Sequence, residues 1–201
     1  MKLAVKNLNY RHQLNNNFCL GPINVESTNY LRVVGANGSG KTTFLKCLAG
    51  VYKATKGQVT LSEANVDQVI WVGAESAIYW DSLTAKEYVV LTCRLYGVSK
   101  KDALNQLDKY KISFINQNIF SLSTGQKKIV SVIASVISKS KLVVLDEPDS
   151  NLDNENRNFL YTLILRESAL GQQFFLFTSH VDSNSFFSDN TIELSHGSVV
   201  C

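Results

Sequence analysis

The segment GANGSGKTT, from Gly35 to Thr43, contains the residue types that hold a chain of phosphates. It fits the pattern G-x-x-x-x-G-K-[ST], with a strand-like run before it and a helix-like run after it. Glycines let the backbone wrap the phosphates, so that N–H groups and the following helix N-terminus face the negative charge. In such a loop Lys41 would reach the β- and γ-phosphates, and the Thr42 hydroxyl would bind Mg²⁺. The predicted phosphate-binding residues are Gly35, Ala36, Asn37, Gly38, Ser39, Gly40, Lys41, Thr42 and Thr43.

A second segment, LVVLDEP at 142–148, places two carboxylates at the end of an apolar strand. Asp146 lies where an aspartate would order the Mg²⁺ shell of a phosphate-loop enzyme. Glu147 follows it and could polarise a water molecule that attacks the γ-phosphate. Acidic residues also finish strands without any such role, but beside a phosphate loop the catalytic interpretation is favoured.

A third segment, SLSTGQKKIVSVIASVIS at 121–138, begins with small polar residues and ends as an apolar stripe. The stripe has the spacing i, i+3, i+4, i+7, i+8, which predicts an amphipathic helix. Its members are Ile129, Val132, Ile133, Val136 and Ile137. Small residues before a helix can expose backbone N–H groups to an anion, although a simple N-cap serine followed by a glycine would look the same.

The residues Leu122-Ser123-Thr124-Gly125-Gln126 resemble the LSGGQ signature of ATP-binding cassette (ABC) ATPases, with threonine in the third position. The resemblance implies that the signature contacts ATP held by the phosphate loop of the opposite subunit. It assigns that role to Ser123, Gly125 and Gln126, so that neither chain closes a site alone.

The resemblance extends further along the chain. SNLD at 150–153 is similar to the D-loop, which crosses the dimer interface. His180, after FFLFTS, falls at the position of the switch histidine that contacts the γ-phosphate, although a lone histidine is more often structural. The resemblance therefore implies two catalytic residues, Glu147 and His180.

Two positions depart from the family pattern. Glu75 stands where the family has a Q-loop glutamine. A carboxylate can still bind Mg²⁺, but it adds negative charge near the phosphates. The alternative is that Glu75 is simply a solvent-exposed glutamate. His12 aligns with the aromatic residue that stacks on adenine, and Tyr10 lies two residues earlier. Either ring could stack on the base or simply pack in the sheet.

The elements that must position these residues alternate between strands and helices. Runs at 3–5 and 18–25 predict an antiparallel edge sheet, and 191–201 predicts a terminal hairpin. Apolar runs at 30–35, 69–72, 142–146 and 174–179 are typical of buried parallel strands. The segment FLKCLAGVY is expected to continue the phosphate loop as a helix, and residues 82–118 are expected to be mainly helix and polar connection. We expect one domain over 1–201, an α/β P-loop core with a small antiparallel β lobe and a helical lobe inserted at about 76–125.

Composition limits the class of protein. The 201 residues are 45% apolar with a net charge of +3, which is ordinary for a globular domain and does not favour nucleic acid as a partner. No apolar run is long enough for a signal peptide or a membrane span. The four cysteines lack CxxC spacing, as expected for thiols in a reducing compartment.

The resemblance implies hydrolysis of ATP to ADP and phosphate with Mg²⁺ as cofactor. It also implies a second ABC domain, expected to be an identical chain, and integral membrane transporter subunits as partners. We expect a peripheral location at the cytoplasmic face of the inner or plasma membrane, or on the matrix side in a mitochondrion. A soluble mechanical ABC ATPase, such as an iron–sulfur assembly factor, is the alternative class.

The cargo is suggested by a narrower resemblance. VIWVGAESAIYWDSLTAKEY and LSTGQKK are similar to the small ATP-binding subunit of the haem exporter used in cytochrome c maturation. Short antibiotic or peptide exporter ATPases share many of these features. No residue of the chain is expected to touch cargo, because cargo chemistry belongs to the partners.

Overall fold

The computed structural model describes residues 1–11, 18–62, 69–73, 82–179, 186–187 and 189–200, so His12, Glu75 and His180 lie outside the described residues. The described elements, in chain order, are β1 (Lys2–Arg11), β2 (Cys19–Thr28), β3 (Tyr30–Val34), α1 (Lys41–Leu48), β4 (Lys56–Leu61), β5 (Val69–Val72), α2 (Ala85–Leu95), α3 (Lys100–Leu107), the 3₁₀ helices η1 (Asp108–Tyr110) and η2 (Ile119–Ser121), α4 (Thr124–Ile137), β6 (Leu142–Leu145), α5 (Asn154–Ala169), β7 (Phe174–Thr178), β8 (Thr191–Ser195) and β9 (Ser198–Val200).

A sheet with strand order β5-β6-β7-β3-β8-β9 forms the centre of the described molecule. Its strands run parallel except for β9, which pairs antiparallel with β8. All four residues of β6 and all five of β7 are buried, because both faces of the sheet are covered. The continuous apolar runs therefore predicted these parallel strands correctly, and the terminal hairpin is confirmed.

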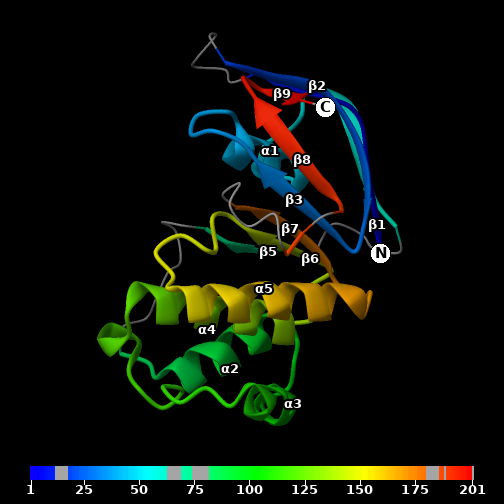
Figure 1. The fold of residues 1–201 in the computed structure, drawn as a ribbon. Helices are drawn as coiled ribbons and strands as arrows, with labels where there is room; N and C mark the ends of the chain where they lie inside the picture. The colour runs from blue at the N-terminus through cyan, green and yellow to red at the C-terminus, as the bar shows by residue number, and fades with distance from the viewer. Residues whose placement is uncertain (12–17, 63–68, 74–81, 180–185, 188, 201) are drawn as a thin grey trace.

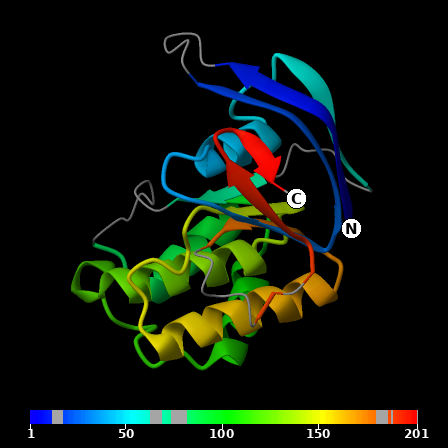
Figure 2. The ribbon, with the colours of Figure 1, turned by 45° about the horizontal axis from the view of Figure 1, so that its top comes forward.

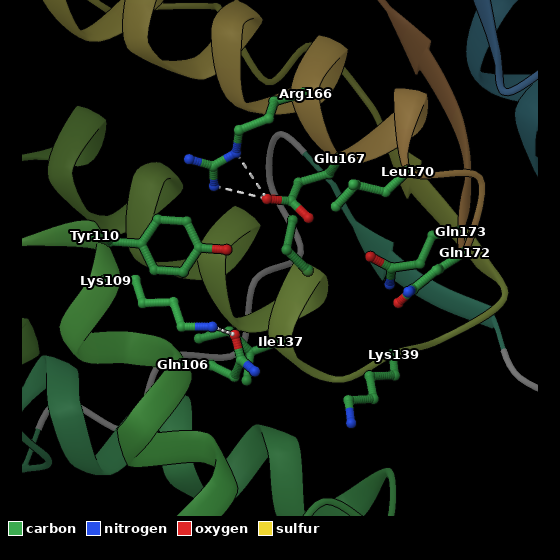
Figure 3. Close-up of a pocket in the computed structure, with 11 residues that line it drawn as sticks. Gln106, Lys109, Tyr110, Ile137, Lys139, Arg166, Glu167, Leu170, Gln172 and Gln173 are labelled. Atoms are coloured by element: carbon green, nitrogen blue, oxygen red, sulfur yellow. Dashed lines mark hydrogen bonds and ion pairs between the residues drawn. The ribbon is translucent and has the colours of Figure 1, made fainter.

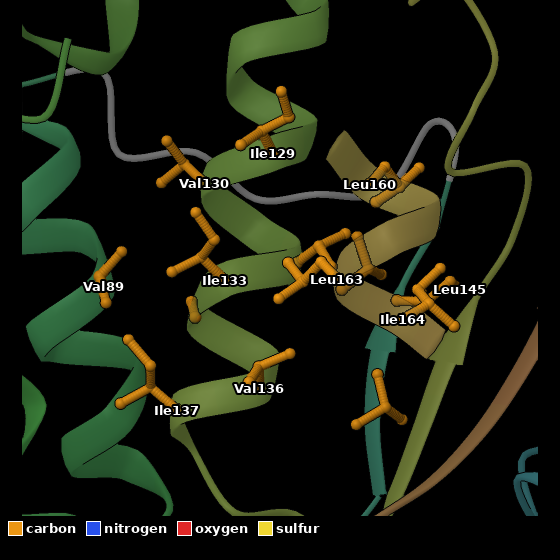
Figure 4. Close-up of a cluster of buried hydrophobic side chains, with 14 of the residues drawn as sticks. Val89, Ile129, Val130, Ile133, Val136, Ile137, Leu145, Leu160, Leu163 and Ile164 are labelled. Carbon is orange, nitrogen blue, oxygen red and sulfur yellow. The ribbon is translucent and has the colours of Figure 1, made fainter. Parts of the chain in front are cut away.

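Helices α4 and α5 pack on one face of this sheet, and α2 packs against α4 (Figures 1 and 4). Val143 and Leu145 of β6 point to that side, toward Ile133 on α4 and Leu163 on α5, which belong to the same buried cluster. The predicted stripe of α4 is buried, and the helix begins earlier than the stripe, at Thr124, because Ser123 caps it. The site segments on α4 and after β6 are thus joined by one apolar core.

The opposite face of the sheet is covered by α1 and by the antiparallel sheet β2-β1-β4, which curves over it (Figures 1 and 2). Leu142 and Val144 point to this side and share a buried cluster with Phe44 of α1 and Leu3 of β1. The molecule is therefore layered, with the parallel sheet between an antiparallel β lobe with α1 and a helical lobe. This arrangement confirms the predicted α/β class.

One predicted boundary is wrong. The sequence FLKCLAGVY was expected to continue as helix, but α1 ends at Leu48, with Ala49 as its C-cap. Gly50 follows with φ +75°, a left-handed conformation that stops the helical hydrogen-bond ladder. Among the described residues, no helix has the length and apolar content needed to cross a membrane.

Candidate nucleotide site

The phosphate loop joins β3 to α1, and its shape requires glycine at two positions. Gly35 has φ +146°, and a Cβ atom there would lie 2.2 Å from the backbone oxygen of Leu194. Gly40, the N-cap of α1, has φ +105°, and a Cβ there would lie 2.7 Å from Cζ of Phe18. Side chains at these positions would therefore clash with the backbone of β8 and with the ring of Phe18, and would hold the backbone in a strained conformation.

Lys41 and Ser39 place polar groups within this loop. The Lys41 ammonium donates to the carbonyl oxygens of Gly35, at 2.9 Å, and Ala36, at 3.1 Å. Ser39 Oγ is buried and has no hydrogen-bond partner among the described residues. A buried hydroxyl without a partner beside a lysine fits a loop that binds an oxygen-rich anion.

Asp146 is held between two threonines from different elements. Thr42 Oγ1, on α1, donates to Asp146 Oδ2 at 2.8 Å, and Thr178 Oγ1, at the end of β7, donates to Oδ1 at 3.0 Å. Hydroxyl and carboxylate oxygens are hard ligands of the kind Mg²⁺ prefers. No cluster of three or more His, Cys, Asp or Glu occurs in the described part of the chain. Thr42 and Asp146 thus fit a metal that takes its other ligands from phosphate and water.

Glu147 faces the same pocket as the phosphate loop. Its backbone N–H donates to Thr178 Oγ1 at 2.7 Å, and its φ is +50°, in the left-handed region. The open pocket has a volume of about 640 Å³ and is lined by Phe18, Asn37, Gly38, Gly40, Lys41, Thr42, Thr43 and Glu147. The structure therefore brings the two predicted segments together, although they lie about a hundred residues apart in the sequence.

Phe18 is a lining residue that the sequence analysis did not single out. The two rings proposed to stack on adenine were His12 and Tyr10, and His12 lies outside the described residues. Tyr10 stacks on Tyr52, with ring centroids 5.1 Å apart and planes within 6°. In the sequence, Phe18 is an aromatic residue at the start of the second predicted strand, which could have marked it as a candidate. Only the fold shows that the Phe18 ring reaches Gly40.

The signature segment forms a capping box at the start of α4. Ser123 Oγ accepts from the N–H of Gln126 at 3.2 Å, and Gln126 Oε1 accepts from the N–H of Ser123 at 3.0 Å. Ser123 and Thr124 are exposed, whereas Gly125 is buried and a Cβ there would lie 2.8 Å from Cδ2 of Leu152. The signature residues are not among those that line the phosphate-loop pocket described above. Their predicted contact with nucleotide in another chain stays a prediction.

A second pocket, of about 320 Å³, lies between α3, η1 and the C-terminal ends of α4 and α5 (Figure 3). Arg166 forms an ion pair with Glu167 at 2.6 Å and lies over the ring of Tyr110. Burial raises the pKa of Tyr110 to about 12, so its hydroxyl stays protonated near neutral pH. This pocket has no glycine loop or carboxylate pair, so the phosphate-loop pocket is the better nucleotide site.

Comparison with known proteins gives one family. A family model described as ABC transporter matches residues 22–150. ATP-binding cassette sub-family A member 2 from Rattus norvegicus is 26% identical over an alignment of 191 residues that covers 89% of this chain and 8% of that protein. The ABC transporter ATP-binding protein NatA from Bacillus subtilis is 26% identical over an alignment of 193 residues that covers 89% of this chain and 78% of that protein.

A solved structure agrees in fold. It is the dimeric post-hydrolysis state of an ATP-binding cassette bound to ADP and Pi, with a TM-score of 0.81 and 21% identity over 99% of this chain and 97% of that chain. The chain spans only 8% of the length of the rat relative.

Proposed function

Because this chain belongs to the ABC transporter family and carries its ATPase domain, we propose that it is the ATP-hydrolysing, nucleotide-binding subunit of an ABC transporter. One observation carries the proposal. The hydrogen bond of 2.8 Å from Thr42 Oγ1 to Asp146 Oδ2 joins the phosphate loop to the carboxylate pair, and Glu147, the next residue, lines the same pocket as the loop.

The residues divide the work of phosphoryl transfer to water. Backbone N–H groups of 35–43 and the Lys41 ammonium hold the phosphates and offset their charge. Glu147 accepts a proton from the attacking water, whose oxygen bonds to the γ-phosphorus while the bond to the bridging oxygen of ADP breaks. Mg²⁺, held by Thr42 and Asp146, would neutralise charge on the phosphate oxygens when bound. His180 is proposed to help hold the γ-phosphate.

A second copy of the chain is proposed to complete each site. Ser123, Gly125 and Gln126 would contact ATP bound by the partner's phosphate loop, and Glu75 would take the Q-loop position near Mg²⁺. The exposed position of Ser123 at the start of α4 supports this arrangement, because the helix N-terminus is free to face an anion from outside the chain.

Integral membrane subunits are the proposed transport partners, with this chain peripheral at the cytoplasmic face of the inner or plasma membrane, or at the matrix side in a mitochondrion. For the cargo we propose haem export in cytochrome c maturation. That proposal is supported only by the similarity of the sequence around 69–88 and 122–128 to that exporter subunit. Another small ABC exporter or a soluble ABC ATPase remains the alternative.

A partner capture from membranes tests this function. Tagged Glu147→Gln protein would be added with MgATP to gently solubilised membranes, with Lys41→Ala as the matched variant that should not hold the nucleotide. We expect polytopic membrane proteins with the first variant only, and haem-handling or cytochrome-assembly factors among them. Capture of only ribosomal, DNA-bound or iron–sulfur proteins would overturn the transporter proposal.

A further inference from the structure

Lys128 is a buried lysine on α4, one turn after the signature segment, and only 5% of it is exposed. Its ammonium donates to the carbonyl oxygen of Glu147 at 3.1 Å and to that of Ser150 at 2.7 Å, and it also donates to Ser150 Oγ. One side chain from the signature helix therefore bonds to both ends of the turn 147–150, within the loop that follows Asp146.

That loop needs external support because its backbone is strained. Glu147 has φ +50° and Asn151 has φ +61°, and neither is a glycine. Non-glycine residues keep such conformations only where the surroundings hold them, and they are common at functional sites. Within the turn 147–150 of this loop, Ser150 Oγ donates to Glu147 O at 3.0 Å. The Lys128 ammonium bonds to both ends of this turn.

The signature helix also touches the end of the same loop. Gly125 lies against Leu152 so closely that a Cβ would come within 2.8 Å of its Cδ2 atom. Lys128 and Gly125 lie on the same side of α4, one turn apart, and both contact the segment 147–152. A tilt or shift of α4 would therefore act on the segment 147–152 at two adjacent contacts, one of which, from Lys128, is made directly to Glu147.

The charge environment explains why an ammonium is tolerated there. Burial lowers the pKa of Lys128, while the negative charges of Asp149 and Glu147 raise it. Asp149 is itself buried, with its Oδ2 accepting from the hydroxyl of Tyr161 at 2.6 Å. A buried charge is costly unless it is paired and hydrogen-bonded, and a methionine could fill the same space without that cost. The lysine is thus favoured for its donors rather than for its volume.

We propose that Lys128 is a positioning residue that couples the orientation of the signature helix to the position of Glu147. Lys128 touches neither nucleotide nor the attacking water and acts through the carbonyl groups of the 147–150 turn. The inference rests on the proposed function, in which the signature of one chain faces the ATP of the other. Contact of Ser123 with the partner's nucleotide would then set Glu147 in the chain's own site, which links the two sites of a dimer.

The first test is steady-state kinetics of Lys128→Met, which keeps the length of the side chain and removes the donors. We expect kcat to fall between about tenfold and a hundredfold, because Glu147 is misplaced. We expect KM for ATP to stay within about threefold, because the phosphate loop is untouched. Cooperativity in ATP should fall toward a Hill coefficient of about 1. Lys128→Arg should recover part of the lost kcat, and exposed Lys101→Met is the matched control.

Ser150→Ala supplies a second variant with a small change in volume. A double-mutant cycle should show that Ser150→Ala lowers kcat in the wild type but has little further effect beside Lys128→Met. Unchanged kcat in both single variants, or additive losses in the double variant, would overturn the proposal.

Amide hydrogen exchange separates failure of this inference from failure of the proposed function. In the nucleotide-free chain, Lys128→Met should speed exchange at 150–152 and leave exchange in α1 unchanged. Unchanged exchange at 150–152 would overturn the inference even if ATP is hydrolysed. If the wild type does not hydrolyse ATP but Lys128→Met still exchanges faster at 150–152, the proposed function is overturned. Lys128 is then still the residue that holds this loop.

Discussion

At the scale of single residues, Thr178 is hydrogen-bonded to both members of the carboxylate pair, Asp146 and Glu147. It is fully buried, donates to Asp146 Oδ1 and accepts from the N–H of Glu147. It lies at the end of β7, two residues before position 180, so it connects the carboxylate strand to the segment of the predicted switch histidine. Its hydroxyl therefore contributes a hydrogen bond to the placement of each acidic residue.

Thr178→Val keeps the shape of the side chain and removes both hydrogen bonds. The N–H of Glu147 is then left without its partner, which should lower the free energy of unfolding by about 1–3 kcal/mol. Urea denaturation measures this, with exposed Thr60→Val as the control, for which we expect a change within about 0.5 kcal/mol. Equal midpoints for Thr178→Val and the wild type would contradict the role given to Thr178.

Phe18 is the aromatic residue that we place at the nucleotide pocket. Phe18→Ala should weaken ATP binding by about 1 kcal/mol, roughly a fivefold rise in Kd, because a ring contact is lost. Isothermal titration with MgATP measures this, and Leu95→Ala, at a side chain that is 71% exposed, is the control. The same loss in both variants would show that Phe18 does not contact the nucleotide.

At the scale of elements, the sequence predicted best what depends on local patterns. The apolar runs of β6 and β7 are buried on both faces, and the stripe from Ile129 to Ile137 is buried on α4. The third strand of the antiparallel sheet, β4, was not predicted, since most of its residues are exposed and its polar–apolar alternation is confined to residues 58–61. The strand order and the contacts of Lys128 and Phe18 depend on tertiary packing, which periodicity does not encode.

The cysteines of two helices test this packing. Burial raises the pKa of Cys47, on α1, to about 12, and burial likewise raises the pKa of Cys93, on α2, to about 12. Because the thiolate is the reactive form and forms only as pH approaches that pKa, both thiols should resist iodoacetamide at pH 8.

The assay uses a Cys201→Ser chain, since residue 201 lies outside the described residues. Mass spectrometry should find label on exposed Cys19 in the native protein, and on Cys19, Cys47 and Cys93 after unfolding in urea. Rapid labelling of Cys93 in the native chain would mean that α2 does not pack as described.

At the scale of the whole molecule, three layers converge on one pocket. The β lobe contributes Phe18 and the segment after β6 contributes Glu147, while Asp146 bonds to Thr42 and Lys128 of the signature helix bonds to Glu147. The phosphate loop and the carboxylate pair could be predicted from sequence because each is a short local motif. In the proposed dimer a second chain completes the site, so closure of the site has to be measured in solution.

The most direct measurement of the central claim is MgATP turnover by Glu147→Gln, together with its mass in solution. The amide cannot accept the proton of the attacking water, so we expect turnover to fall by at least about a hundredfold while MgATP binding persists. A closed dimer should accumulate with MgATP, and Glu193→Gln, at an exposed carboxylate on β8, should behave as wild type. Full hydrolysis by Glu147→Gln would contradict the role of Glu147 and the mechanism built on it.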